Sequence, residues 1–302
     1  MSVITTGNHP KALWPGVKRW WGREYGEHPV EWKDLFEQAD SDKAYEEDVE
    51  LTGFGLMPQK PEGDSISYTS ETQGAVKRYT HVVYGLGWIC TEEEYEDSQY
   101  PVVSKRRTSA LAFSMRQTEE IVGANVYNRA FNSSYTGGDG KEMCATDHPV
   151  VGGTQSNELA VAADLSEASL ENMLIQIMQA KNSRGLNISL IGQKLIVPPS
   201  LSFEAHRILK SSQQNDTPNN AVNALRSMGM LPKGVSVNHY LTDSDAWFVR
   251  TNAPAGPTRY NRRAAAFASD SDFDTANRKA KATIRFAVGW TDWRGAYGTP
   301  GA

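Results

Sequence analysis

The 302-residue chain contains few cysteines, no long apolar run and no excess of basic residues. Cys90 and Cys144 are its only cysteines, and two thiols in a chain of this length indicate a reducing compartment rather than a disulfide scaffold. No stretch reaches the roughly 20 apolar residues that span a bilayer, and the first residues do not resemble a signal peptide. The formal net charge of −5 gives no general attraction to nucleic acid. These absences predict a protein that folds in a cytoplasm and has no membrane partner.

Aromatic residues are concentrated near the beginning of the chain, where Trp14, Trp20, Trp21 and Trp32 occur within 19 positions. Most of residues 1–90 shows neither a helical nor a strand period, and glycine and proline interrupt it repeatedly. Burying one aromatic side chain removes roughly 150–250 Å² from water, so we do not expect these rings to remain in solvent. We predict that they pack against the rest of the chain or against a neighbouring copy, as part of an assembly.

Residues 34–50 are strongly acidic, and this segment allows two interpretations. It is either one solvated face of a helix or a strap that meets basic residues of a neighbouring copy. The arginines Arg250, Arg259, Arg262 and Arg263 are its candidate partners. Their alternative interpretation is a solvated loop.

The pattern then changes to alternating residues that are typical of strands. Residues 66–68 and 76–84 fit the two arms of a hairpin around a turn at residues 70–74, after a polar stretch at 58–64. Because such a hairpin has little apolar core of its own, we expect it to project from the body.

A long helix is predicted over residues 102–131. Thr91 and Glu94 form a capping box for a short helix before it, which Pro101 interrupts. Nearly 30 residues at 1.5 Å each span about 45 Å, which suggests a spine that organises other elements. Later segments predict a helix after Asp164 or Ser166, a buried strand at 188–197, a helix after residue 199, paired strands at 235–240 and 246–250, and a strand at 282–290. The mixture indicates an α+β body.

Few residues suggest catalysis or ligand binding. Cys144 and His148 are the best candidates for a nucleophile and its base, but Pro149 places the histidine in a turn and no oxyanion-hole motif is visible. The loop at 137–141 lacks the first glycine and the hydroxyl of a phosphate-binding loop, and residues 270–274 lack the glycine and glutamate of a calcium loop. We therefore predict no catalytic residue, cofactor or metal. A cysteine hydrolase is the alternative from a different class.

Five segments together resemble one family: YGLGW at 84–88, MCATDHP at 143–149, LIVPP at 195–199, YLTDSDAWF at 240–248 and GWTDWRGAYG at 289–298. They are similar to the major capsid (head) proteins of tailed bacteriophages, in particular the group related to the Mu-type major head subunit. The resemblance covers roughly residues 50–302.

This resemblance implies the Hong Kong 97-type capsid fold, an α+β fold with an N-terminal arm, an extended loop, a long spine helix, and peripheral and axial domains. The segments found above are assigned as follows: the arm to 1–57, the extended β-hairpin loop to 58–84, the peripheral domain to 85–164, the axial domain to 165–275 and a return to the peripheral domain to 276–302.

The implied function is self-assembly into the icosahedral head shell that encloses double-stranded DNA, in the virion after assembly in a bacterial cytoplasm. A nanocompartment shell of the encapsulin type is the nearest alternative. Expected partners are other copies in pentamers and hexamers, a portal, a separate scaffolding protein, a decoration protein and non-specifically bound DNA. Although Lys60 and Lys77 lie in or beside the loop, no cross-linking partner is visible, so no covalent cross-link is predicted. The expected inter-subunit contacts are Trp14, Trp20, Trp21, Trp32, Lys60, Glu62, Tyr68, Lys77, Arg78, Arg259, Arg262 and Arg263.

Overall fold

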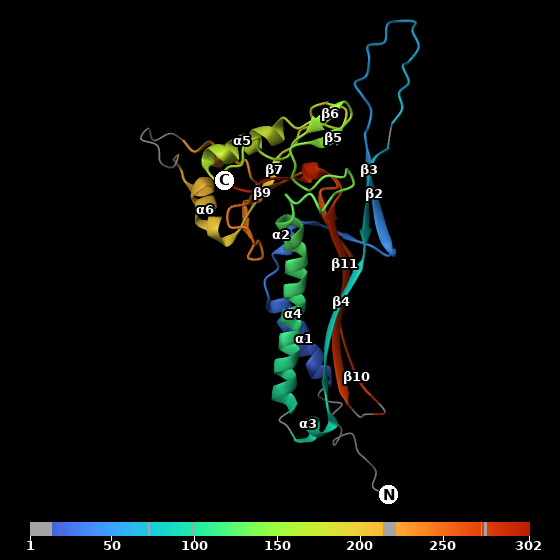
Figure 1. The fold of residues 1–302 in the computed structure, drawn as a ribbon, viewed down its shortest axis with the longest axis vertical. Helices are drawn as coiled ribbons and strands as arrows, with labels where there is room; N and C mark the ends of the chain where they lie inside the picture. The colour runs from blue at the N-terminus through green and yellow to red at the C-terminus, as the bar shows by residue number, and fades with distance from the viewer. Residues whose placement is uncertain (1–13, 72, 98–99, 214–221, 273, 275–276) are drawn as a thin grey trace.

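The computed structural model describes residues 14–71, 73–97, 100–213, 222–272, 274 and 277–302. The molecule has three parts: an upright body built on a long sheet, a lobe to one side of its upper end, and a loop that projects beyond both (Figure 1). We refer to them as the long sheet, the lateral lobe and the projecting loop.

The long sheet has the strand order β1 (Glu37–Asp40), β10 (Pro257–Ser271), β11 (Arg278–Trp290) and β4 (Val82–Cys90). Alternate residues of β11 are buried, and Ala280, Ala282, Ile284 and Phe286 face one side of the sheet. This apolar side packs against the spine helix α4 (Tyr100–Asn128). A strand with period two and a helix with an apolar stripe therefore share one core.

The predicted spine helix is confirmed, with slightly different ends. It begins at Tyr100, so Pro101 lies in its first turn, where the missing N–H leaves no helical hydrogen bond unmade. The short helix α3 (Glu92–Asp97) precedes it. The Thr91 hydroxyl accepts the Glu94 N–H at 3.2 Å, as the capping pattern predicts.

The arm begins with α1 (Trp14–Glu27), which packs along α4, and continues through α2 (Trp32–Leu35), β1 and β2 (Tyr45–Leu51). The helical interpretation of the acidic residues 34–50 is wrong, because most of them belong to the strands β1 and β2. Strand β1 runs parallel to β10, with Glu37 opposite Thr258 and Asp40 opposite Asn261. Sheet pairing therefore fixes the acidic segment to the body.

Strand β2 pairs antiparallel with β3 (Gln73–Thr80), and the projecting loop, residues 52–71, joins them. The predicted hairpin is displaced in the sequence. Residues 66–68 pair with no strand among the described residues, and residues 82–84 belong to β4 in the body. The turn lies at 61–64, where the Asp64 N–H bonds to the Pro61 carbonyl at 3.3 Å and Gly63 adopts a φ of 88°. Glycine tolerates this left-handed conformation.

The lateral lobe contains a second sheet with the order β12 (Ala296–Thr299), β9 (Trp247–Thr251), β7 (Gly192–Val197) and β8 (Val235–Val237). Its helices are α5 (Glu167–Met178), α6 (Ser202–Lys210) and α7 (Ala224–Met228), with short 3-10 turns at Pro199–Leu201 and Trp293–Gly295. A small hairpin, β5 (His148–Val150) and β6 (Gly153–Gln155), lies beside it. Ser166 caps α5, as predicted, by accepting the Ser169 N–H.

Three predictions about this half of the chain differ from the structure. Strands β8 and β9 do not pair with each other but flank β7. Strand β10 lies in the long sheet, so Arg259, Arg262 and Arg263 belong to a strand and not to a loop. For the same reason the lobe ends before residue 275. The expected return of residues 276–302 is met only in part: the predicted last strand, 282–290, lies in the long sheet as β11, but residues 296–299 form β12 in the lobe. Pairing between distant strands decides each of these points, and the local pattern does not contain it.

Candidate assembly surfaces

The aromatic residues of the arm are buried within their own protomer. Trp21 stacks on Tyr25 at a centroid distance of 5.0 Å and on Phe267 at 5.9 Å, and only 7% of its surface is exposed. Trp32 is 5% exposed and lies under the guanidinium of Arg259, 3.6 Å from the ring centroid. The expectation that Trp21, Trp32 and Arg259 meet a neighbouring subunit is therefore corrected. The side chains of Trp14 and Trp20 lie outside the described part of the chain.

A cluster of buried charges joins the arm to the spine helix and the long sheet. The Glu119 carboxylate accepts hydrogen bonds from the Tyr25 hydroxyl and from Arg259 at 2.6 Å, and Arg116 lies 3.6 Å away. Burial and the Glu119 charge raise the pKa of Tyr25 well above its usual range. The arm covers the side of α4 that carries Arg116 and Glu119. Removing one partner of a buried ion pair typically costs about 3–5 kcal/mol, so the cluster fixes the arm firmly.

Glu120, the next residue of α4, caps the short helix α2 from outside. Its carboxyl oxygens accept the backbone N–H groups of Glu31 at 3.1 Å and of Trp32 at 2.8 Å. Those donors have no partner within their own helix. Burial raises the pKa of Glu120 to about 7, so this cap changes charge near neutral pH.

The acidic strands of the arm find their cationic partners on the same chain. Asp34 binds Lys194 of β7 at 2.6 Å, and Glu50 lies 3.3 Å from Arg294. Burial opposes ionisation of Asp34, but the bonds from Lys194 and Ser236 outweigh it and lower its pKa. Because Lys194 and Arg294 belong to the lateral lobe, these contacts connect the lobe to the arm. They take up carboxylates that the strap interpretation assigned to a neighbour.

The projecting loop, in contrast, is almost entirely exposed. Met57 is 97% exposed and Tyr68 93%. Lys60 and Glu62 have no ion-pair partner among the residues that the structure describes. Large apolar side chains left in water on a chain extension are typical of surfaces that a partner covers.

The base of the loop is held more firmly. The Arg78 guanidinium lies 3.6 Å from the centroid of the Tyr45 ring and 3.7 Å from Glu47. The Tyr260 hydroxyl donates to Asp48 at 2.6 Å. The loop therefore projects from a fixed hairpin.

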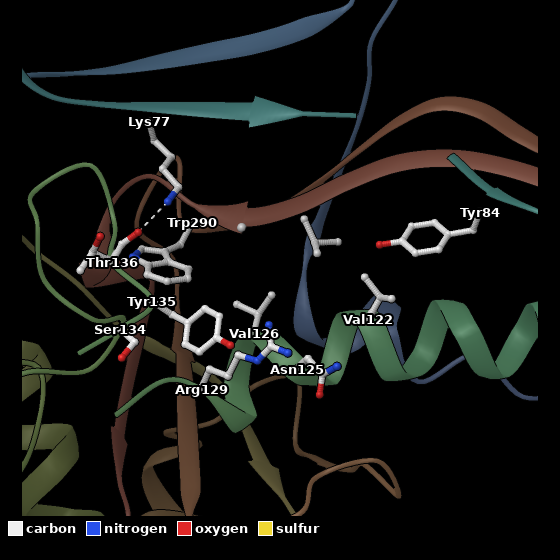
Figure 2. Close-up of a pocket in the computed structure, with 12 residues that line it drawn as sticks. Lys77, Tyr84, Val122, Asn125, Val126, Arg129, Ser134, Tyr135, Thr136 and Trp290 are labelled. Carbon is white, nitrogen blue, oxygen red and sulfur yellow. Dashed lines mark hydrogen bonds between the residues drawn. The ribbon is translucent and has the colours of Figure 1, made fainter. Parts of the chain in front are cut away.

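A cavity of about 590 Å³ opens beside this base, between α4, β11 and the residues that follow α4 (Figure 2). Lys77 crosses its upper end, where its Nζ donates to the Thr136 carbonyl at 2.8 Å and lies 5.2 Å from the Trp290 ring centroid (Figure 2). Arg129 lies over the Tyr135 ring at 4.3 Å. Burial lowers the pKa of Lys77. Cations beside aromatic faces form a surface suited to an acidic or aromatic side chain.

Arg262 and Arg263 lie at a bulge of β10, opposite Arg285 of β11. Arg263 is exposed, whereas Arg262 and Arg285 are partly buried. Within the described ranges none of the three has a carboxylate partner. The prediction that Arg262 and Arg263 contact a neighbour therefore stays a prediction, with a surface available for it.

Cys144 and His148 do not form a catalytic pair. His148 is fully buried, with Nδ1 2.6 Å from Asp139 and Nε2 3.0 Å from Asn157, and its ring stacks on Trp293 at 4.4 Å. Cys144 lies in the core beside the spine helix, where burial raises the pKa of its thiol well above the usual value. A nucleophile needs an accessible, ionisable thiol, so this geometry does not support the hydrolase alternative. The sequence did not predict the contact between Asn157 and His148, because no motif links the two positions.

Among the described residues, no group of three or more histidine, cysteine, aspartate or glutamate side chains is arranged to hold a metal. Within the same ranges, none of the helices combines the length and the apolar character needed to cross a bilayer.

Residues 74–298 match the phage capsid protein family. The fold is similar to that of a structure described as Mycobacterium phage Patience, with a TM-score of 0.53, 11% identity, and coverage of 98% of this chain and 89% of that chain. It is also similar to the bacteriophage PhiM1 mature capsid (TM-score 0.54, 11% identity, coverage 90% and 86%) and to a virus-like particle from Pyrococcus furiosus (TM-score 0.54, 10% identity, coverage 94% and 98%). No curated protein matches the chain.

Proposed function

Because this chain belongs to the phage capsid protein family and is a major capsid protein, we propose that its copies close into the icosahedral head shell of a tailed bacteriophage, around double-stranded DNA. The observation that carries the proposal is the family match over residues 74–298, which include β3, β4, β10, β11, the spine helix and the lateral lobe. The long sheet with α4 then corresponds to the peripheral domain, and the lobe to the axial domain.

The architecture suits a subunit that must occupy both five-fold and six-fold surroundings. Contacts between unlike surfaces close into rings when the rotation between copies allows it. The body is stiffened by the buried charges around Glu119, whereas residues 52–71 extend into solvent. A rigid body with an adaptable extension lets one sequence form slightly different neighbour contacts.

The residues that we propose for inter-subunit contact are those of the earlier prediction that remain available on the protomer surface. Lys60, Glu62 and Tyr68 lie on the projecting loop, and Arg78 lies at its base. Lys77 is partly used within the protomer. Arg262 and Arg263 offer unpaired positive charge on the body. Packaged DNA would meet the inner surface weakly and without sequence preference, through phosphate contacts.

A portal, a separate scaffolding protein and a decoration protein are further proposed partners. The proposed role requires no catalytic residue and no cofactor. A nanocompartment shell is the second candidate, because the fold resembles the virus-like particle from Pyrococcus furiosus as closely as it resembles the phage capsids. The family match favours the phage head, and the ratio of absorbance at 260 and 280 nm of particles from infected cells separates the two.

The test is to shorten the projecting loop without disturbing the body. Residues 55–69 are replaced by a short glycine-serine linker, because β2 and β3 remain paired at the base. We expect a folded protomer with an unchanged circular dichroism spectrum that forms no shells by negative-stain electron microscopy, whereas the unmodified chain forms them. Normal shells from the shortened chain would contradict the role of the loop. An unmodified chain that sediments only as a monomer, with or without its scaffolding partner, would contradict the proposed function.

A further inference from the structure

A cavity of about 500 Å³ opens on the lateral lobe between α6, α7 and the start of β8. Helix α6 lies on the side of the lobe away from the long sheet (Figure 1), so the cavity is remote from the projecting loop and its base. Its floor is the edge of the lobe core, because Leu225 and Leu231 are buried and Leu209 and Val235 pack against the same core. A hollow of this size with an apolar floor is typical of small-molecule sites.

The charged and titratable side chains that line this cavity are all basic. They are His206 and Lys210 of α6, Arg226 of α7 and Lys233 of the turn before β8. Among the described residues, no aspartate or glutamate lines the cavity. This charge contrasts with the chain as a whole, whose formal net charge is −5. A hollow lined by one sign of charge raises the local concentration of ligands of the opposite sign.

One of the four basic side chains is held in place by the protomer itself. The Arg226 guanidinium donates from Nη1 to the Lys210 carbonyl at 2.9 Å, and this bond joins α7 to the end of α6. The side chains of His206, Lys210 and Lys233 are exposed and make no hydrogen bond or ion pair within the described ranges. A role at a helix end accounts for Arg226 but not for the three basic side chains beside it. These three are available to an anion that enters the cavity.

Two glycines keep the rim of the cavity open. Gly229 ends α7 with a φ of 63°, and Gly234 precedes β8 with a φ of 66°. Glycine adopts this left-handed conformation without the steric cost that a side chain imposes. Nothing lies within 4 Å of the position that a Cβ would occupy at either residue. The rim therefore leaves room for a ligand beside Arg226 and Lys233.

We propose that this cavity binds a compact phosphate-bearing anion, with its phosphate groups on Lys210, Arg226 and Lys233. Phosphate suits the site because it offers several charged acceptor oxygens, which lysine and arginine bind through charge-assisted hydrogen bonds. A nucleoside triphosphate adds a ring system that covers the apolar floor, whereas inorganic tripolyphosphate offers the phosphates alone. The inference goes beyond the proposed function, since every residue of the site belongs to one protomer.

The shape of the site favours a small ligand over the backbone of DNA. The basic side chains surround a hollow of about 500 Å³, so they converge on one point. A protein that follows DNA instead arranges its basic residues as a patch or stripe along the duplex, because the phosphates are spread along the helix axis. Convergent charges match the adjacent phosphates of one small molecule.

Isothermal titration calorimetry of the full, unassembled chain with tripolyphosphate and with ATP tests the inference. We expect saturable binding at one site per protomer at physiological ionic strength. Lys210→Gln and Lys233→Gln should each weaken binding about tenfold or more, because each removes a hydrogen bond to a charged group. Both side chains are exposed, so the variants should fold normally, which circular dichroism checks.

Arg207→Gln is the matched control, because it removes the same charge from the same helix. Arg207 pairs with Glu204 at 2.7 Å and does not line the cavity, so this variant should bind both ligands as tightly as the unmodified chain. Tighter binding of ATP than of tripolyphosphate would support the contact with the apolar floor, and equal binding would assign the affinity to the phosphates alone; both outcomes support the phosphate site.

A short DNA duplex at the same phosphate concentration separates the two sources of phosphate and should compete more weakly than tripolyphosphate. Equal competition by the duplex would overturn the assignment to a compact anion. Absence of saturable binding, or an equal loss of affinity in Arg207→Gln, would overturn the inference as a whole. Each of these results would leave the proposed function intact, since shell formation is not measured.

Discussion

Replacing Glu120 by glutamine should remove a pH dependence from the stability of the protomer. The Glu120 side chain is buried under the arm and accepts the N–H groups of Glu31 and Trp32. Burial, the larger cause, raises its pKa from 4.5 to about 7, against the lowering effect of these two hydrogen bonds. The folded chain therefore holds a proton on Glu120 between pH 4.5 and 7 that the unfolded chain releases.

The sign follows from this difference in bound protons. Since the folded state binds more protons in this interval, the free energy of unfolding falls as the pH rises from 4.5 through 7. The pKa of Glu120 differs between about 4.5 in the unfolded chain and about 7 in the folded chain. At about 1.4 kcal/mol per pH unit, this difference contributes about 3 kcal/mol to the free energy of unfolding. Between pH 5 and pH 8 the unmodified protomer should lose about 2–3 kcal/mol through this group.

Urea unfolding of dilute, unassembled protein, followed by tryptophan fluorescence, measures this loss at the two pH values. Glu120→Gln keeps the size of the side chain and an acceptor oxygen but cannot titrate. All other titratable groups are shared, so the difference between the two proteins isolates Glu120. We expect the pH dependence of the variant to be smaller by about 2–3 kcal/mol. Identical slopes for the two proteins would refute the reasoning, and with it the docking of α2 on the spine helix.

Three further predictions concern the body. Cys144→Ala should lower the free energy of unfolding by about 1 kcal/mol, because it leaves a small cavity, and shells should look normal by electron microscopy. Loss of assembly in a stably folded variant would indicate a chemical role for the thiol. A methyl group at Gly295 would overlap the backbone before β10, so Gly295→Ala should lower the free energy of unfolding by about 2–3 kcal/mol. Gly153 has open space around it, so Gly153→Ala should change the free energy of unfolding little in the same urea titration. Tyr260→Phe removes the hydrogen bond to Asp48 and should lower the local stability of the β2–β3 hairpin by about 1 kcal/mol. Amide hydrogen exchange in β2 and β3 should then be faster. Unchanged exchange would show that this bond does not hold the hairpin.

The long helix and the cap of α5 could be predicted because their signals are local. The apolar stripe between Leu111 and Val126 and the hydroxyl of Ser166 act on residues three or four positions away. The strand at 282–290 was found for the same reason, since Ile284 and Phe286 alternate with polar residues. The resemblance to capsid proteins also depended on short sequence segments.

The arm was the main failure of prediction. Its irregular sequence suggested that Trp21 and Trp32 needed a neighbouring copy, but the protomer buries both against α4 and β10. The missing information was that Arg116 and Glu119 of the spine helix bind Tyr25 and Arg259. Deleting the arm would therefore remove part of the core of the protomer and not only an assembly contact.

The sequence by itself determined the α+β composition, the spine helix, the exposed character of the projecting loop and membership of a capsid family, because these depend on local periodicity and short motifs. Only the tertiary structure decided which charges are buried, that β10 and β12 belong to different sheets, and that β4 forms an outer edge of the long sheet. Each of these depends on contacts between residues far apart in the chain, such as Tyr25 with Glu119 and Asp48 with Tyr260. Side-chain pattern reports which face of an element is apolar, but it does not specify what covers that face.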